Sequence, residues 1–312
     1  MLLESQKIIF KFSAEPENKN IKLFFNISVL LFLFAVSLSN IPLVKANESD
    51  AANKNINHSG IFPQTQLYPY YIANPLRTTF SMQYMYFDKT KITNTSKRRY
   101  NLKAGGHLGL YRNKAEKTNR GWQVTFSGGF QGQFDPASSQ DNVGWDGIMA
   151  LSLEMRNSNA FAQRLGIHHI SSHIGDELIE RTGLKRINYT RQEMRYGLMW
   201  FMLPHWQSYV EIGKSYDLRN KTLQKPWRSE IGFQYENDKY WMSKLGWYMG
   251  TDLSSYEENN WDINTSLHLG LISRVNERKY RLGFEFYKGR SPLGEFFQRK
   301  EKYISFGLWI DI

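Results

Sequence analysis

The sequence predicts an all-β protein: a closed antiparallel transmembrane β-barrel of about twelve strands that follows a cleaved signal peptide. Three observations predict this fold. Apolar and polar residues alternate with a period of two from about residue 77 to the end of the chain. The alternating segments are about ten residues or longer, the length that crosses a bilayer when a strand is tilted. The connections between these segments alternate between short and long, as in outer-membrane barrels.

The composition is compatible with this fold. Only 41% of the residues are hydrophobic and the mean hydropathy is −0.53, values expected when the inside of a barrel is polar. The absence of cysteine argues against a disulfide scaffold and a thiolate metal site. The formal net charge of +11 is scattered along the chain. Nucleic acid is therefore not an expected partner, whereas anionic lipid is compatible with this charge.

The first expected element is a signal peptide. Residues 23–39 form the apolar run LFFNISVLLFLFAVSLS, preceded by Lys19 and Lys22 and followed by the small-x-small site Val44–Lys45–Ala46. A transmembrane anchor is the alternative, because the run is nearly long enough to span a bilayer. We expect a signal peptide over residues 1–46, a short periplasmic segment with little structure over 47–76 and the barrel over 77–312.

Twelve strands are expected in the barrel. They lie near residues 78–88, 99–112, 122–134, 147–156, 160–174, 187–202, 206–217, 227–236, 239–250, 261–274, 279–288 and 301–312. Short connections such as 157–159 and 236–238 alternate with connections of roughly ten residues. With both chain ends in the periplasm, the short turns are periplasmic and the longer loops lie outside.

The last strand, YISFGLWIDI, carries a second indication of location. Ser305, Gly307, Ile310 and Ile312 resemble the C-terminal signal that the barrel-assembly machinery recognises, although Ile312 stands where phenylalanine is usual. The barrel-assembly machinery is therefore an expected partner. The expected location is the bacterial outer membrane.

The stretch HHISSHIGDE, residues 168–177, is the main candidate for chemistry. It lies where the strand 160–174 reaches its outer end. Alternation divides this strand into two faces. Phe161, Leu165, Ile167, His169, Ser171 and His173 share the face assigned to lipid, and Arg164, Gly166, His168, Ile170, Ser172 and Ile174 share the face assigned to the lumen.

These faces predict a nucleophilic site on the lipid side. Residues two apart on a strand lie about 6.6 Å apart at their Cα atoms, so His169 can reach Ser171 with a hydrogen bond. Asn188 is expected on the neighbouring strand, on the same face and at similar height. Serine as nucleophile, histidine as base and a third group that orients the imidazole are the minimum for acyl transfer. Asn188 is the expected orienting group, with Glu177 as the alternative. A site that faces lipid predicts an acyl ester as substrate.

A metal site and a purely structural role are the alternatives for this stretch. His169 and His173 on a strand are about 13 Å apart, too far to share one ion. Asp176 and Glu177 supply oxygen ligands suited to calcium. With His173 they form the expected binding residues. The structural alternative is a polar strand end that enters a solvated loop.

The strand pattern and the outward His-x-Ser resemble outer-membrane phospholipase A, a twelve-stranded barrel. This family uses a serine, a histidine two residues before it, an asparagine on the next strand, and calcium. The resemblance implies Ser171, His169 and Asn188 as catalytic residues, phospholipid as substrate and calcium as cofactor. Lipid A deacylase, a barrel that also uses His-x-Ser, makes lipid A a second expected substrate. The residues after Ser171 and the longer spacing to Asn188 depart from the phospholipase pattern.

Most of the mature chain resembles an uncharacterised family of predicted outer-membrane proteins, a domain of unknown function. Three stretches carry this resemblance: HHISSHIGDE, RINYTRQE at 186–193 and GRSPLGEFF at 289–297. It implies a barrel and its location, and it implies no activity. Proline and glycine in the third stretch are expected to shape the last outer loop.

The alternative to a lipid hydrolase is a non-enzymatic barrel, either a narrow channel or a structural surface protein. A row of charged residues on the predicted lumen face supports it, because side chains can largely fill a twelve-stranded barrel. The row consists of Arg164, Arg191, Glu193, Arg195, Arg228, Glu230, Arg281 and Glu285. Expected partners under either hypothesis are membrane lipids, and a homodimer stays open as one arrangement.

Overall fold

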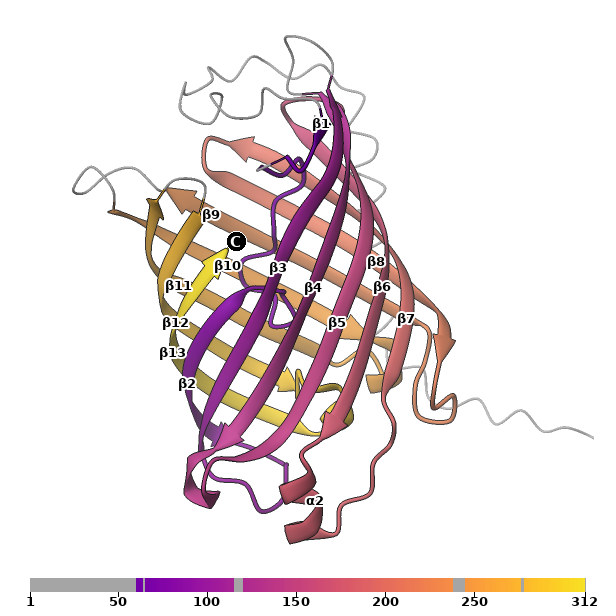
Figure 1. Cartoon of the computed structure of the whole chain (residues 1–312), viewed down its shortest axis with the longest axis vertical. Coiled ribbons are helices and arrows are strands. Elements are labelled where there is room, and N and C mark those ends of the chain that lie inside the picture. The colour runs from indigo at the N-terminus through magenta and orange to yellow at the C-terminus, as the bar shows by residue number, and fades with distance from the viewer. Residues whose placement is uncertain (1–59, 64, 115–119, 238–244, 276–277, 312) are drawn as a thin grey trace, which may run out of the picture.

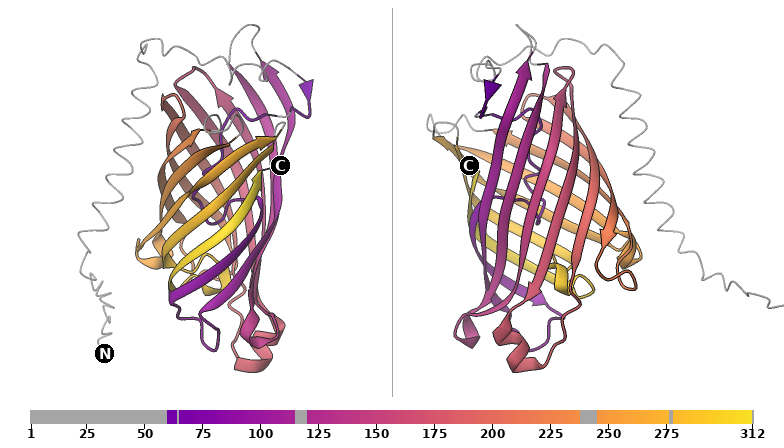
Figure 2. Two further views of the ribbon diagram at one scale, coloured as in Figure 1. Left: turned by 90° about the vertical axis from the view of Figure 1, so that its left-hand side faces the viewer. Right: turned by 45° about the vertical axis from the view of Figure 1, so that its right-hand side comes forward.

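The computed structural model describes residues 60–63, 65–114, 120–237, 245–275 and 278–311. The expected signal peptide, residues 47–59, the end of the predicted turn at Asp238 and the terminal Ile312 lie outside the described residues. The described chain forms a tall, tilted β-barrel (Figures 1 and 2). Among the described residues, no helix is long and apolar enough to cross a membrane.

The predicted twelve-stranded antiparallel barrel is confirmed. Its strands are β2 (Phe80–Lys89), β3 (Arg98–Lys114), β4 (Gly121–Asp135), β5 (Asp141–Arg156), β6 (Phe161–Ile174), β7 (Thr190–Leu203), β8 (Trp206–Leu218), β9 (Trp227–Asn237), β10 (Leu245–Tyr256), β11 (Ile263–Val275), β12 (Arg278–Arg290) and β13 (Lys300–Asp311). Residues 239–244 of the ninth predicted strand lie outside the described chain. The predicted boundaries are mostly correct to within a few residues.

Pairing between the first and last barrel strands closes the sheet. β13 pairs with β2 from Ile310 opposite Phe80 to Lys302 opposite Lys89, and each other strand pairs with its sequence neighbours. Closure leaves no strand edge in the bilayer, where an unpaired N–H or C=O group costs several kcal/mol.

Alternation along each strand separates an apolar outside from a polar inside. On β2, Met82 and Tyr84 are exposed whereas Ser81 and Gln83 are buried. The outward apolar side chains form the surface that faces lipid, and the inward polar side chains fill the lumen.

The two ends of the barrel differ in the length of their connections. One end, called here the α2 end, carries the connections 90–97, 136–140, 175–189, 219–226, 257–262 and 291–299. The other end carries the shorter connections 115–120, 157–160, 204–205, 238–244 and 276–277. Because longer loops face the outside in outer-membrane barrels, we assign the α2 end to the cell exterior.

The longest connection contains a helix where the sequence analysis expected a loop. Helix α2 spans Asp176–Thr182, and Gly183 ends it with a φ of 67°. Leu178 on this helix is buried. A helix this short is stabilised mainly by tertiary packing, here through Leu178. Its hydrophobic pattern is too short to be recognised in the sequence.

Residues 65–79, which precede β2, lie inside the barrel. The short strand β1 (Gly60–Ile61) pairs with the end of β3, and residues 65–79, called here the lumen plug, run inside the barrel wall (Figures 1 and 2). The sequence analysis expected a short periplasmic segment with little structure over residues 47–76, and the described part of it from residue 65 on runs along the inner side of the barrel wall. The segment contacts both polar lumen side chains and small apolar clusters, in which Tyr68 and Tyr71 pack with Met199 and Tyr209, and Ile72 packs with Tyr248.

Named contacts hold the lumen plug. The Tyr68 N–H donates to Glu154 at 3.2 Å, and the Tyr71 hydroxyl donates to Glu211 at 3.2 Å. The ring of Tyr71 also stacks on Tyr209, with centroids 3.6 Å apart. A Cβ at Gly197 would lie 2.8 Å from the Tyr71 hydroxyl, so this glycine leaves the space that the plug occupies.

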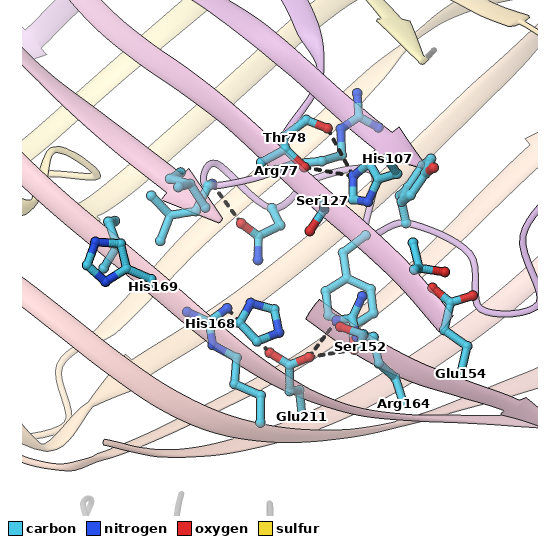
Figure 3. A pocket seen from close by; sticks show the side chains of 18 residues that line it. Arg77, Thr78, His107, Ser127, Ser152, Glu154, Arg164, His168, His169 and Glu211 are labelled. Carbon is cyan, nitrogen blue, oxygen red and sulfur yellow. Dashed lines mark hydrogen bonds and ion pairs between the residues drawn. The ribbon is translucent and has the colours of Figure 1, made fainter. Parts of the chain in front are cut away.

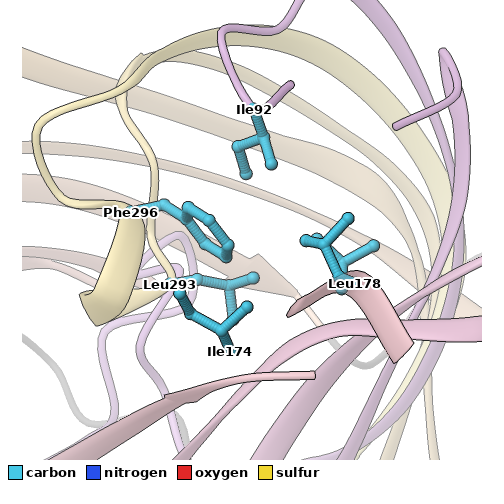
Figure 4. Packing of buried hydrophobic residues seen from close by; sticks show 6 residues of the cluster. Ile92, Ile174, Leu178, Leu293 and Phe296 are labelled. Carbon is cyan, nitrogen blue, oxygen red and sulfur yellow. The ribbon is translucent and has the colours of Figure 1, made fainter. Parts of the chain in front are cut away.

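An apolar cluster closes the lumen at the α2 end (Figure 4). It joins two outer connections to helix α2 and to the ends of two strands. Its members, called here the outer cluster, are Ile92, Val143, Ile174, Leu178, Leu293 and Phe296. The barrel is therefore filled from both ends by its own chain.

Close backbone contact at Gly175 predicts a measurable cost for a single methyl group. A Cβ at this position would lie 1.8 Å from the backbone oxygen of Asn142. We expect Gly175→Ala to lower the free energy of unfolding by about 1–3 kcal/mol. Gly147→Ala is the matched control, because its Cβ would meet nothing nearer than 3.9 Å. Urea unfolding in detergent micelles measures both, and equal stabilities would contradict the expectation.

Candidate functional site

The outer end of β6 presents its two faces as predicted. Leu165 and Ile167 are exposed on the lipid side, and His169 and Ser171 continue that row by alternation. Ser172 is buried on the lumen side. On β5, Met149 pairs with His169 and Gly147 pairs with Ser171.

Ser171 contacts a histidine, but not the one two residues before it. Its Oγ lies 3.4 Å from Nε2 of His173, and the ring of His173 stacks on Trp145 with centroids 4.1 Å apart. Within the described chain, His169 makes no side-chain hydrogen bond. Trp145 of the neighbouring strand β5 therefore holds the His173 ring where it contacts the Ser171 hydroxyl.

The guanidinium of Arg186 restricts the chemistry of His173. It donates from Nη2 to Nδ1 of the ring at 2.5 Å. A neutral imidazole that accepts at Nδ1 carries its proton at Nε2. In this arrangement Nε2 donates to Ser171 and is not free to take the serine proton.

The predicted third member is displaced. Thr190 pairs with Ser171 and Gln192 pairs with His169 across β6 and β7. Asn188 lies before the start of β7, is exposed, and has a φ of 55°. The connection leaves the sheet before this residue, so Asn188 does not continue the outward row of β7 as the sequence analysis expected.

The predicted metal ligands lie in the first turn of α2. Asp176 and Glu177 are both exposed there, and carboxylates at a helix N-terminus are favoured by the helix dipole. Among the residues that the structure describes, no group of three or more histidines and carboxylates is arranged to hold a metal ion. These two residues therefore do not fit a calcium site by themselves.

The lumen side of the same strand end forms a clamp that the sequence analysis missed. The Glu295 N–H donates to the Ser172 hydroxyl at 2.8 Å, and the Gly294 N–H donates to Asp146 at 3.2 Å. The Glu295 carboxylate in turn accepts the N–H groups of Ile187 at 2.8 Å and Tyr189 at 2.9 Å. The three stretches HHISSHIGDE, RINYTRQE and GRSPLGEFF therefore meet at one point.

Deeper in the lumen, buried charges pair around a small cavity (Figure 3). Arg164 contacts Glu211 at 2.6 Å and Arg228 contacts the same carboxylate at 3.1 Å. The ring of His168 lies beside Glu211 in Figure 3, whereas the ring of His169 lies apart from them. The predicted charged lumen row is confirmed, since all of its members face inward. The cavity holds about 80 Å³, space for several water molecules.

Glu258 connects three outer connections. It lies in the short helix η2 (Glu257–Asn259). Its carboxylate accepts the Tyr189 hydroxyl at 3.2 Å, the Lys225 N–H at 3.2 Å and Nη1 of Arg191 at 2.7 Å. Burial raises the pKa of the Glu258 carboxyl to about 7, although Arg191 acts in the opposite direction.

A family model described as "Protein of unknown function (DUF1207)" matches residues 38–311. No curated protein matches the chain in sequence. Two similar solved structures are outer-membrane phospholipases. The Salmonella typhi dimer with bound calcium has a TM-score of 0.54 and 12% identity, covering 76% of this chain and 94% of that one. The Escherichia coli enzyme has a TM-score of 0.54 and 11% identity, covering 77% and 94%. At this identity the similarity establishes the fold, and with it an outer-membrane barrel.

The filled lumen predicts that the barrel does not conduct ions. The lumen plug occupies the barrel from one end and the outer cluster closes the other. We expect no conductance steps above background when the folded protein is inserted in planar bilayers. Heat-modifiable migration in gels verifies that the barrel is folded, and steps of reproducible size would contradict a sealed lumen.

Glu258 predicts a stability that falls as pH rises. Its folded pKa of about 7 lies above its ordinary value of 4.5, so between these values the folded state binds more protons than the unfolded state. The contribution is fully present below about pH 4.5 and is lost as pH rises through 7, on the order of 3 kcal/mol.

Urea unfolding at pH 4.5, 6 and 7.5 tests this dependence. Glu258→Gln should remove the decline between these pH values, because the amide does not titrate. Glu257→Gln is the control, since Glu257 accepts only an exposed backbone N–H, that of Trp227. The expectation fails if wild type and Glu258→Gln share one pH profile.

Proposed function

The chain belongs to the family described as "Protein of unknown function (DUF1207)", and because that description states no activity we propose one from the site itself. We propose that this outer-membrane barrel hydrolyses acyl esters of membrane lipids on its outward face, with Ser171 as nucleophile. One observation carries the proposal: Ser171 and His169 lie two residues apart at the outer end of β6, in the row that Leu165 and Ile167 continue on the exposed face.

The reaction assigns a role to each group. The Ser171 oxygen attacks the ester carbonyl, and an imidazole accepts the hydroxyl proton and passes it to the departing alcohol. Water then hydrolyses the acyl-serine with the same imidazole as base. Sequence spacing assigns the base to His169, and the Arg186 contact that holds the His173 proton at Nε2 favours the same assignment. The His169 ring must rotate toward Ser171 for this step, since catalytic hydrogen bonds often tighten only when substrate binds.

The amide that would orient the His169 imidazole is not in contact with that ring in the structure. Asn188 would have to approach His169 from the connection before β7. Gln192 already pairs with His169 across the strands, and its side chain is held by Asp217 and Tyr216. An amide oxygen at this place can accept the Nδ1 proton of an imidazole.

The substrate follows from location and fold. The site lies at the outer end of the barrel, where ester groups of the outer leaflet lie. Solved structures that share the fold are named outer-membrane phospholipases, which supports a phospholipid ester as the first substrate and lipid A esters as the second. One of them contains bound calcium. Because Asp176 and Glu177 lack a third ligand, no step here is assigned to calcium.

A non-enzymatic surface barrel is the second candidate function. The specific observation in its favour is that the His173 ring is committed to Arg186, Trp145 and Ser171 at once. Such a ring acts as a structural contact rather than as a base. The filled lumen makes the channel version of this candidate the less favoured one.

Ester hydrolysis by the refolded protein in mixed micelles of phospholipid and detergent tests the proposal. We expect Ser171→Ala to lower kcat at least 10³-fold and His169→Asn to lower it at least 10²-fold. Ser208→Ala is the matched control, because Ser208 alternates with the buried Tyr209 near the other end of the barrel. Each assay is run with calcium and with chelator.

The same assay separates the two histidines and the two candidate functions. A loss with His173→Asn but not with His169→Asn would assign the base to His173 instead. Asn188→Ala and Gln192→Ala decide which amide orients the ring. Hydrolysis that is absent from wild type, or unchanged by Ser171→Ala, would favour the non-enzymatic barrel.

A further inference from the structure

Basic side chains align across neighbouring strands on a different part of the outer surface. Lys288 of β12 pairs with Lys302 of β13, and Lys302 pairs with Lys89 of β2. Arg98 begins the next strand, β3, and pairs with Tyr86 of β2, so it lies next to the lysines but three residues below Lys89 in register. All four basic side chains are exposed. They are called here the basic row, and β4 and β5 separate it from the Ser171 site on β6.

The basic row lies directly above the apolar band of the barrel. On the three strands that carry the lysines, Phe286 and Ile304 are exposed two residues toward the membrane centre, and Tyr86 is exposed three residues from Lys89 because of a bulge. Phe286 pairs with Ile304, and Ile304 pairs with Tyr86. The row is therefore at the height where the hydrocarbon of the outer leaflet meets its headgroups.

The protein compensates little of this charge. Asp88 contacts Lys302 at 2.8 Å, and both side chains are more than half exposed. A β-bulge places both Asp88 and Lys89 next to Lys302. Lys89 and Lys288 form no ion pair within the described residues. Like charges on directly opposed residues of neighbouring strands destabilise a sheet, so an anion bound between these lysines would stabilise this register.

We propose that the basic row binds the phosphate group of a membrane lipid whose acyl chains lie along Phe286, Ile304 and Tyr86. Three ammonium groups stand on adjacent strands, and the Arg98 guanidinium lies beside Tyr86 at the next level down. Lysine ammonium groups are suited to phosphate as point charges, and arginine adds a planar pair of donors. The apolar side chains below add contacts that a free phosphate ion does not make.

Lipid binding to the folded protein in dodecyl maltoside micelles tests this inference. The probe is dioleoyl phosphatidic acid, and bound lipid is counted by native mass spectrometry across a titration. Dioleoylglycerol has the same acyl chains without phosphate, and inorganic phosphate has the charge without the chains. We expect binding of phosphatidic acid alone, weakening as salt is raised.

Matched variants locate the binding. Lys89→Gln, Lys288→Gln and Lys302→Gln combined should raise the Kd for phosphatidic acid at least tenfold. The same charge change at Lys185, Lys221 and Lys225, exposed lysines of other outer connections, should leave the Kd within twofold. Asp88→Asn should lower the Kd, because it removes the one acid in the row.

A replacement of the three lysines by arginine keeps the test valid if the glutamine variant does not fold. The arginine variant should bind with a Kd within threefold of wild type. Equal affinities of wild type and the glutamine variant would overturn the inference. Equal binding of dioleoylglycerol, or displacement of the lipid by inorganic phosphate at the same concentration, would also overturn it.

Discussion

The hydrogen-bonded pairing of β13 with β2 is the interaction on which the rest of the structure depends. In hydrocarbon, an open sheet would expose a row of unpaired backbone groups, and closure removes that row. A closed barrel then determines where side chains go. Apolar residues face outward to lipid, and the inward positions take polar and charged residues that a soluble core would exclude. The low hydrophobic content of the chain follows from this arrangement, in which polar residues fill the inside of the barrel.

The polar interior creates a second requirement, because each buried charge needs a partner. Glu211 meets this requirement with Arg164 and Arg228 while it also accepts the hydroxyl of Tyr71 from the lumen plug. Removing one member of such a group leaves another buried charge unpaired, which costs more than the pair contributes. The plug and the barrel wall are therefore parts of one network.

One strand end serves both sides of this wall. Ser172 turns inward and accepts the N–H of Glu295, which holds the connection 291–299 at this end of the barrel. Ser171 turns outward to the lipid face beside His173. The stretch HHISSHIGDE thus combines a structural clamp with the candidate nucleophile. The clamp joins this stretch to RINYTRQE and GRSPLGEFF through hydrogen bonds. The proposed chemistry lies on the opposite, outward face of the same strand.

The sequence by itself determined the class of fold, the approximate strands and the face of residues inside the strands. His169 and Ser171 face lipid, and Arg164 faces the lumen, because alternation is a local property of an extended backbone. Tertiary structure alone decided the contacts. Trp145 from the neighbouring strand and Arg186 from a connection direct His173 to Ser171, and the turn of the chain before β7 removes Asn188 from the row. The lumen plug left no periodic pattern, since its contacts come from strands far away in sequence. Periodicity specifies the direction of a side chain, whereas its partner depends on residues that only the closed barrel brings together.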